Sequence, residues 1–156
     1  MSDDEQYCVL MVCQENSCVS PLAAGLLQFA AESKGLEDHL YIDSAGLKVP
    51  VEGKEPDLRV LTTAENHGFK LAHQSRQINL EDFEDFNEIL VMDELLLMEV
   101  LKLTMNPAHK LKVKLITDHD KRKTKSKNIS APEGNDQEQF EELYEQLWYC
   151  CMGFLA

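Results

Sequence analysis

The feature that most constrains this chain is an alternation of short, β-rich apolar runs with longer segments of helical periodicity. The pattern predicts strands at residues 7–12, 40–42, 89–92 and 111–116, and helices at residues 21–31, 58–67, 94–103 and 137–154. Such an alternation favours right-handed crossovers and a parallel sheet that is covered by helices on both faces. The predicted fold class is therefore α/β, with a four-stranded parallel sheet.

The size of the chain fits one compact unit. It has 156 residues, of which 44% are apolar, so residues 1–156 are expected to form a single domain. No stretch approaches the ~20 apolar residues that a membrane span needs, and the acidic start at residues 2–5 is unlike the basic start of a signal peptide. We expect a soluble, cytoplasmic protein with no membrane partner.

The charge balance limits the class of partner. A formal net charge of -13 repels phosphate backbones, so nucleic acid is not an expected partner. The Lys-rich residues 121–127 go against this trend. A nuclear-import or acidic-partner patch is one interpretation, and a solvated loop is the favoured one.

The five cysteines are odd in number and unevenly spaced, which is typical of a reduced compartment rather than of a disulfide framework. Cys150 and Cys151 are adjacent near the end of a predicted helix and have no nearby histidine, so a buried or half-buried structural role is expected for them. No metal and no cofactor are expected.

The segment between the first strand and the first helix is the expected site. In open α/β sheets ligands bind at the carboxyl ends of the strands, near the point where the strand order reverses. Backbone N–H groups in residues 13–20 can converge on an anion, with the positive end of the helix dipole behind them. Cys13 lies at the base of this loop, where the same groups favour a thiolate.

Cys13, five further residues, Val19, Ser20 and Pro21 resemble the phosphate loop of the low-molecular-weight protein tyrosine phosphatases, in which a cysteine and five residues precede Arg-Ser-Pro. Further matches follow in order along nearly the whole chain. They are Asp43-Ser44-Ala45, Glu55-Pro56-Asp57-Leu58-Arg59, His73-Gln74-Ser75-Arg76-Gln77-Ile78 and Met92-Asp93-Glu94. The resemblance implies a sheet with strand order 2-1-3-4.

The resemblance also implies roles for individual residues. Cys13 is expected at the position of the nucleophile, and Ser20 as its hydroxyl partner. The phosphate loop between them is expected to comprise Gln14, Glu15, Asn16, Ser17 and Cys18. Asn16, Ser44 and His73 are expected to brace that loop.

The departures from the family pattern fall on the catalytic groups. Val19 stands in the place of the phosphate-clamping arginine, and Glu15 stands in the place of a glycine. Either Ser130 or Ala131 occupies the general-acid position, and Glu133 is the nearest carboxylate in the sequence. Losing an oxyanion donor and a general acid together costs roughly 10⁴–10⁶ in rate.

These losses predict a pseudophosphatase, which acts as a binding or regulatory protein for an unidentified protein partner, as a monomer or weak dimer. One alternative is a residual or atypical protein tyrosine or acid phosphatase that uses Cys13 as nucleophile. Another is a thiol redox protein that uses Cys13 and Cys18. Glu15 has two interpretations as well: a solvated carboxylate, or a buried one that mimics the lost phosphate.

Overall fold

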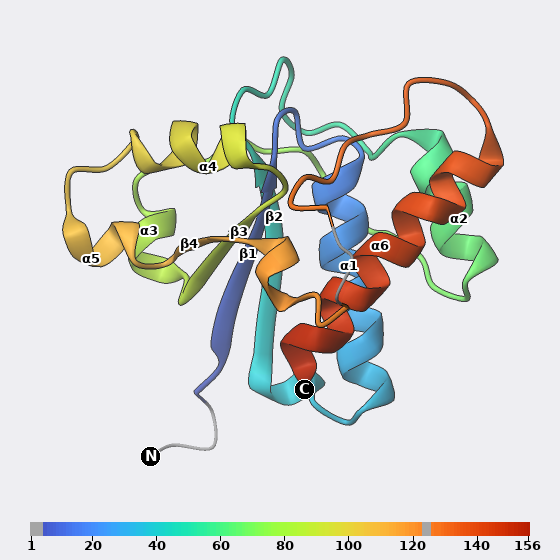
Figure 1. Ribbon diagram of the computed structural model, residues 1–156, viewed down its shortest axis with the longest axis horizontal. Coiled ribbons are helices and arrows are strands. Elements are labelled where there is room, and N and C mark those ends of the chain that lie inside the picture. The colour runs from blue at the N-terminus through green and yellow to red at the C-terminus, as the bar shows by residue number, and fades with distance from the viewer. Residues whose placement is uncertain (1–4, 123–125) are drawn as a thin grey trace.

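The computed structural model describes residues 5–122 and 126–156, so the middle of the Lys-rich segment 121–127 lies outside the described residues. Four strands, β1 (Tyr7–Cys13), β2 (Leu40–Gly46), β3 (Glu88–Val91) and β4 (Val113–Leu115), form one sheet in the order β2-β1-β3-β4. All three neighbouring pairs are parallel. The α/β class and the strand order are therefore confirmed (Figure 1).

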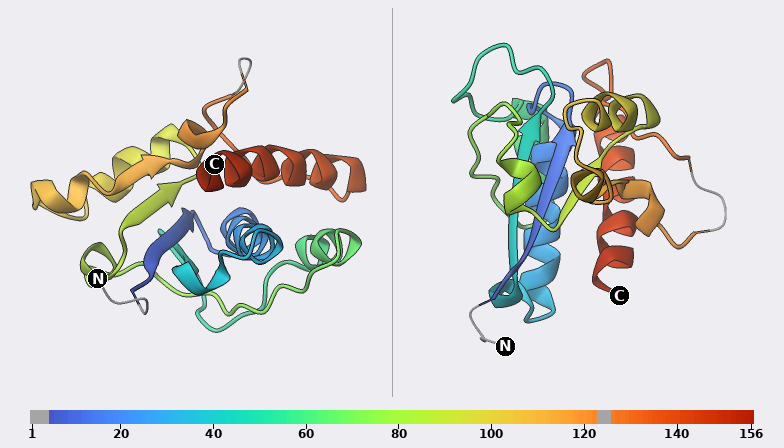
Figure 2. Two further views of the ribbon diagram at one scale, coloured as in Figure 1. Left: turned by 90° about the horizontal axis from the view of Figure 1, so that it is seen from below. Right: turned by 90° about the vertical axis from the view of Figure 1, so that its left-hand side faces the viewer.

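The helices lie on both sides of the sheet because the strand order reverses between β1 and β3. The β1–β2 and β3–β4 crossovers run in opposite directions along the sheet, so the helices of these two crossovers lie on opposite faces. In Figures 1 and 2 one side carries the three long helices α1 (Val19–Ser33), α2 (Leu58–Asn66) and α6 (Gln137–Leu155). The other side carries α3 (Asp82–Asp85), α4 (Glu94–Leu101) and α5 (Pro107–Lys110).

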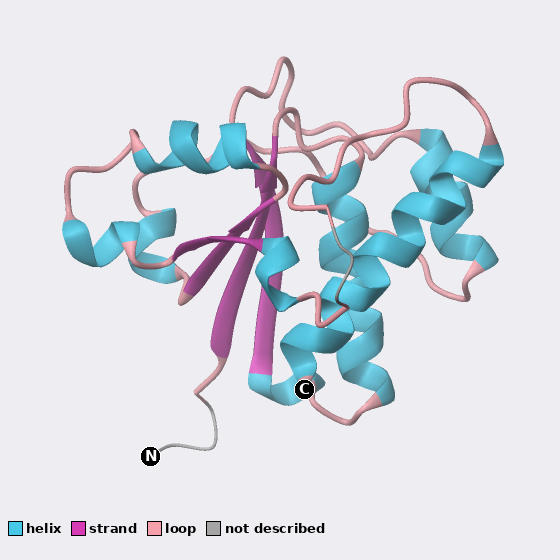
Figure 3. Cartoon of the chain, in the orientation of Figure 1, coloured by secondary structure: helices cyan, strands magenta, loops and turns pink. Residues whose placement is uncertain are grey.

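The core lies between the sheet and these helices. The inner strands β1 and β3 contribute Val9 to Val12 and Ile89 to Val91, which are almost fully buried. Cys150 and Cys151 are buried in α6, as predicted, and the Cys151 thiol contacts the Ala23 carbonyl of α1 at 3.8 Å. No helix in the described ranges is long and apolar enough to cross a membrane. Figure 3 shows how the helices and strands alternate with loops along the chain.

Two strand predictions were wrong in extent. The strand expected at 111–116 is only β4, because Asn106 caps the short helix α5 and Pro107 begins it, which leaves Leu111 exposed beyond its end. Ile116–His119 then forms the 3₁₀ helix η2. The strand expected at 40–42 continues to Gly46, because its polar residues still pair in register with β1.

The helix boundaries differ less. Helix α1 begins at Val19, two residues before the predicted start, with Pro21 in its first turn, where a missing N–H costs no helical hydrogen bond. Helix α4 ends at Leu101 and α2 at Asn66, close to their predicted ends. The 3₁₀ helix η1 (Glu37–His39), which leads into β2, had no counterpart among the predicted elements.

Candidate active site

The loop of residues 14–18 connects the carboxyl end of β1 to the N-terminus of α1. Its carbonyl groups face outward: those of Cys13, Gln14 and Ser17 accept hydrogen bonds from the N–H groups of Leu47 (2.9 Å), Lys48 (2.8 Å) and Asp57 (2.8 Å). The N–H groups of residues 14–18 donate to no acceptor within the described residues. With its carbonyls tied down and its N–H groups free, the loop keeps the form of an anion nest.

Asn16 is the centre of a hydrogen-bond network behind the loop. Its Nδ2 donates to Ser20 Oγ (3.0 Å) and to Ser44 Oγ (2.9 Å). Its Oδ1 accepts from the Arg76 N–H (2.9 Å) and lies 2.8 Å from His73 Nε2. Asn16 has φ 59°, a left-handed conformation that asparagine tolerates better than most residues, and it is only 1% exposed. The network therefore fixes the turn of the loop.

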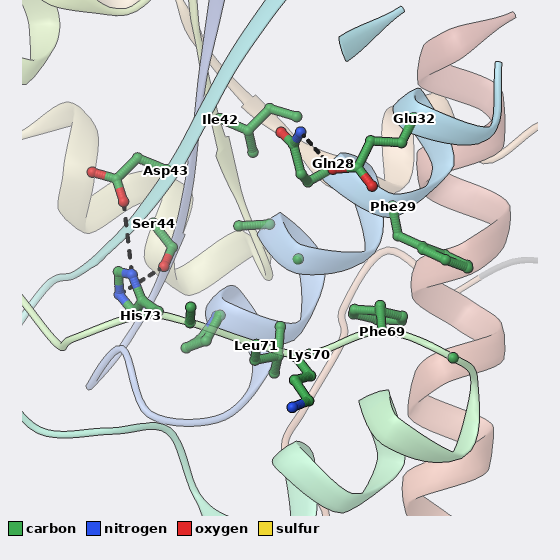
Figure 4. Close-up of a pocket in the computed structure, with 15 residues that line it drawn as sticks. Gln28, Phe29, Glu32, Ile42, Asp43, Ser44, Phe69, Lys70, Leu71 and His73 are labelled. Atoms are coloured by element: carbon green, nitrogen blue, oxygen red, sulfur yellow. Dashed lines mark hydrogen bonds and ion pairs between the residues drawn. The ribbon is translucent and has the colours of Figure 1, made fainter. Parts of the chain in front are cut away.

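His73 extends this network to the outer strand β2. Its Nε2 also lies 3.0 Å from Ser44 Oγ, and its Nδ1 lies 3.7 Å from Asp43 Oδ1. Figure 4 shows the three side chains together beside β2. Burial lowers the pKa of His73, an effect that Asp43 opposes and Arg76 reinforces. The structure thus brings together Asn16, Ser44 and His73, the three residues that were expected to brace the loop.

Cys13 and Ser20 meet at the floor of the loop. Cys13 Sγ lies 2.8 Å from Ser20 Oγ, and both side chains are buried. Ser20 Oγ accepts a hydrogen bond from Asn16, so its own hydroxyl proton can point at the Cys13 sulfur or at the Ala45 carbonyl, which lies 3.5 Å away. The Cys13 sulfur can therefore share a hydrogen bond with the Ser20 hydroxyl.

A hollow of about 380 Å³ opens in front of the loop. It is lined by Cys13, Gln14, Glu15, Ser17, Cys18, Val19, Met92, Asp93, Leu96, Ile129, Ser130 and Ala131. This lining, all of it within the described residues, contains two carboxylates and no lysine, arginine or histidine. Val19 is the first residue of α1 and is 4% exposed, so an apolar side chain fills the place expected for the clamp.

Glu15 lies on the open side of the loop. Its side chain is exposed, and it accepts no hydrogen bond from any described residue. A carboxylate that mimicked a bound phosphate would be buried against the free N–H groups of the loop. The geometry therefore supports the solvated interpretation of Glu15.

The segment expected to carry the general acid is held at both ends. The Ile129 N–H donates to the Met92 carbonyl at 2.9 Å. At the other end Arg59 Nη1 donates to the Gly134 carbonyl at 2.7 Å, while its Nε and Nη2 hold Asp57 at 2.9 and 2.6 Å. Both candidate positions, Ser130 and Ala131, face the hollow, and neither carries an acid.

Glu133, the nearest carboxylate in the sequence to the general-acid position, does not line this hollow. Glu133 lines a separate depression beside α6, whereas Asp93 lines the hollow in front of Cys13. Asp93 is the N-cap of α4 and accepts a hydrogen bond from the Leu96 N–H at 2.7 Å. Sequence analysis missed its place there, although its position directly after β3, beside β1 in the sheet, was a usable signal.

Cys18 is the second thiol in the hollow. It is 9% exposed and is the N-cap residue of α1. Burial raises the pKa of Cys18 to about 12, with further increases from Asp57 and Cys13 and a small opposing effect from Arg59. Within the described residues no group of histidine, cysteine and acidic side chains is placed to hold a metal ion.

A cysteine at the foot of an anion nest, on a parallel sheet of order 2-1-3-4, defines a phosphate-loop domain of the cysteine phosphatase class. The chain belongs to the low molecular weight phosphotyrosine protein phosphatase family, whose model matches residues 8–156. The family prediction is thus confirmed, and Cys13 lies at a phosphate-loop-like position.

Individual relatives agree with this assignment. The low molecular weight phosphotyrosine protein phosphatase of Gallus gallus is 34% identical over 157 residues, which cover 99% of this chain and 98% of that protein. The crystal structure of a drosophila arginine phosphatase is 33% identical, with a TM-score of 0.84 and 94% of both chains covered. A protein tyrosine phosphatase from Entamoeba histolytica, solved with Hepes in its active site, shares the fold at 24% identity, with a TM-score of 0.90 over 96% of this chain and 95% of that one.

Proposed function

We propose that this chain is a pseudophosphatase, a binding or regulatory protein built on the phosphatase fold. The observation that carries the proposal is the charge of the hollow, in which Glu15 and Asp93 are the only charged side chains among the described lining residues. A phosphate dianion there meets repulsion from both carboxylates. Val19 cannot donate the paired hydrogen bonds by which an arginine stabilises the transition state.

The missing proton donor supports the same proposal. Departure of an aryloxide needs an acid near the leaving oxygen, and Ser130 and Ala131 provide none. Asp93 faces the hollow, but one of its oxygens is committed to the Leu96 N–H as a helix cap. The two losses together correspond to roughly 10⁴–10⁶ in rate.

The intact network around Asn16 holds the loop in one shape, which a binding surface requires. The proposal includes an unidentified protein partner. It also includes a cytoplasmic location, which is supported by the free thiols of all five cysteines, every one of which is described.

The decisive experiment measures turnover of p-nitrophenyl phosphate by the wild type, by Cys13→Ser and by the Gallus gallus relative under the same conditions. We expect a wild-type rate at least about 10⁴-fold below that of the relative and equal to that of Cys13→Ser. A rate within about 100-fold of the relative that is abolished in Cys13→Ser would overturn the proposal. That result would establish the residual phosphatase with Cys13 as nucleophile.

A thiol redox function is a second candidate, because Cys13 and Cys18 line the same hollow. The Cys13 thiolate would attack hydrogen peroxide to give a sulfenic acid and release hydroxide. The Cys18 thiolate would then attack the Cys13 sulfur, form the disulfide and displace a second hydroxide, which takes up the thiol proton as water. Because the pKa of Cys18 is about 12, little thiolate is present at neutral pH, so this second step is expected to be slow.

Peptide mapping by mass spectrometry after mild peroxide, with and without reductant, tests this candidate. The expected product is a Cys13–Cys18 disulfide that forms slowly and reverses with reductant, while Cys18→Ser accumulates the sulfenic acid instead. Oxidation of Cys8 or Cys150 with Cys13 still reduced would rule the redox function out.

A further inference from the structure

Helix α4 has an unusual composition for a surface helix. Between Glu94 and Glu99 it has three leucines and a methionine in succession, and it ends in Val100 and Leu101. Leu96 and Val100 are buried, whereas Leu97 and Leu101 pack against the core but stay partly exposed. Leu95 and Met98, however, are 70% and 57% exposed. Leu95 and Met98 are three residues apart and so lie next to each other on the helix surface, and an exposed apolar patch of this kind indicates a partner for the outer face of α4.

The exposed face carries opposite charges at its two ends. Glu94 is the first residue of α4, and Lys102 follows directly after its last. The Glu94 carboxylate has no hydrogen bond or ion pair to any described residue. Lys102 contacts Glu99 at 3.6 Å, but its side chain is 68% exposed, and an exposed pair of this kind contributes little. Both charges are therefore available to a partner.

The spacing of these residues is symmetric. Met98 lies four residues from Glu94 and four residues from Lys102. If two copies of α4 packed antiparallel about a two-fold axis at Met98, Glu94 of each copy would face Lys102 of the partner subunit, and Leu95 would face Leu101 of the partner subunit. The charged groups lie about 12 Å apart along the helix, so one short pairing of about two turns uses them all.

We propose that the outer face of α4 docks a second copy of this chain in this antiparallel arrangement. The interface is isologous, because one patch supplies the acid, the base and the apolar surface that its copy needs. Met98 meets Met98 of the partner subunit at the axis, where a flexible thioether adapts to close contact. Figure 2 shows α4 at the rim of the molecule, where a second copy has access.

The overall charge decides how strong this dimer is. Two chains of net charge -13 repel each other, but at about 0.15 M ionic strength this repulsion is screened beyond about 8 Å, while contacts across the interface persist. A single short helix on each side buries less than the roughly 1,200 Å² of a standard interface. We therefore expect a dissociation constant on the order of 100 µM. The same net charge disfavours an anionic lipid surface as the occupant.

The first test is sedimentation velocity from about 10 µM to about 1 mM protein in 0.15 M salt. Leu95→Asn removes an apolar contact from the proposed interface, and Leu58→Asn is its matched control, since Leu58 is 75% exposed on α2. We expect the wild type and Leu58→Asn to dimerise alike, and Leu95→Asn to raise the dissociation constant at least about tenfold. A monomeric wild type at about 1 mM, or equal effects of the two substitutions, would refute the dimer.

The second test reverses the charges. Glu94→Lys places lysine opposite lysine, and Lys102→Glu places glutamate opposite glutamate, so each should weaken the dimer by about fivefold or more. The double variant restores two opposite-charge pairs and should return to within about twofold of the wild type. Thermal unfolding of each variant checks that α4 is still folded. Failure of the double variant to recover, with α4 folded, contradicts the antiparallel register.

Flotation with anionic vesicles tests the alternative that the outer face of α4 binds a membrane surface. We expect no binding to vesicles of phosphatidylserine and phosphatidylcholine by wild type or Leu95→Asn. Vesicle binding that depends on Leu95, with a wild type that is monomeric in solution, would assign α4 to a membrane and overturn the proposal. None of these outcomes depends on whether Cys13 turns over substrate, so the dimer and the proposed pseudophosphatase function succeed or fail separately.

Discussion

The two sides of the loop at residues 14–18 differ in what has changed. On the side that faces the sheet, Asn16, Ser20 and Ser44 are buried and mutually hydrogen-bonded, as the family pattern implies. On the side that faces the hollow, Glu15 and Val19 replace residues of that pattern. The shape of the loop and its chemistry are therefore separable properties, set by different side chains only one or two positions apart.

The energetics explain the difference. A buried polar group that loses its hydrogen-bond partner costs about 1–3 kcal/mol. A substitution in the network behind the loop therefore lowers the free energy of unfolding, whether or not the protein is an enzyme. An exposed position such as Glu15 changes stability by less than about 0.5 kcal/mol. Substitutions on the side of the loop that faces the hollow therefore cost less stability than substitutions behind the loop.

The largest expected effect comes from introducing the family's arginine and general acid on the side of the loop that faces the hollow. We predict that Val19→Arg alone gives no measurable recovery of p-nitrophenyl phosphate turnover, because Glu15 competes for the guanidinium and no acid is present. Adding Ser130→Asp or Ala131→Asp should raise the rate at least about 100-fold above that single variant for whichever position is correctly placed. Recovery from Val19→Arg alone would show that the acid is dispensable.

The next largest effect is expected from a substitution in the hydrogen-bond network behind the loop. Asn16→Ala removes two donated and two accepted hydrogen bonds and leaves a left-handed residue without its support. We expect the free energy of unfolding to fall by about 2–4 kcal/mol in urea titrations. Glu15→Ala is the adjacent control and should change it by less than about 0.5 kcal/mol. Similar losses at the two positions would remove the distinction between the two sides.

A smaller effect concerns pH. Because burial lowers the pKa of His73 below its ordinary 6.5, the unfolded chain binds a proton more readily than the folded one. The contribution is fully present above about pH 6.5 and is lost as pH falls through the lower folded-state pKa. Between pH 7.5 and 5 the free energy of unfolding should therefore fall more steeply in the wild type than in His73→Gln. Equal slopes would mean that His73 titrates alike in both states.

The smallest effect tests the charge of the hollow. Glu15→Gln removes one exposed carboxylate without altering the loop, so inorganic phosphate should bind about two- to fivefold more tightly in an NMR titration. Lys48→Gln, which removes an exposed charge beside the loop but outside the hollow, is the control and should not strengthen binding. Unchanged phosphate affinity in Glu15→Gln would show that the carboxylate does not oppose the anion.

The sequence predicted the fold well because its determinants are local. Apolar runs and helical periodicity gave the α/β class, and the ordered family-like segments gave the strand order. The predicted strand bounds were wrong where tertiary context decides them. Leu111 belongs to an apolar run typical of a strand, but the helix α5, which Asn106 caps, leaves it exposed. Asp43 is polar but lies in β2, because Leu10 of β1 pairs with it. Neither effect is visible in hydrophobic pattern alone.

The site was predictable in its parts but not in its surroundings. The positions of Cys13, Asn16, Ser44 and His73 in the site were expected from the family resemblance. The depth of Cys18, which raises its pKa, and the presence of Asp93 in the hollow depend on how separate segments converge. Glu133 was a reasonable candidate by proximity in sequence, but its segment turns toward α6.

The contacts of Arg59 decide which residues beside the hollow can vary in evolution. It holds the segment of residues 129–135 through the Gly134 main-chain carbonyl, at 2.7 Å, and through Asn135, at 3.1 Å, and the other end is held by the backbone of Ile129. The residues at 130–132 contribute nothing to either anchor. Their identity can vary without moving the backbone, and an aspartate introduced there would be held by the same two anchors. The position of this segment and the chemistry of its side chains can therefore evolve independently.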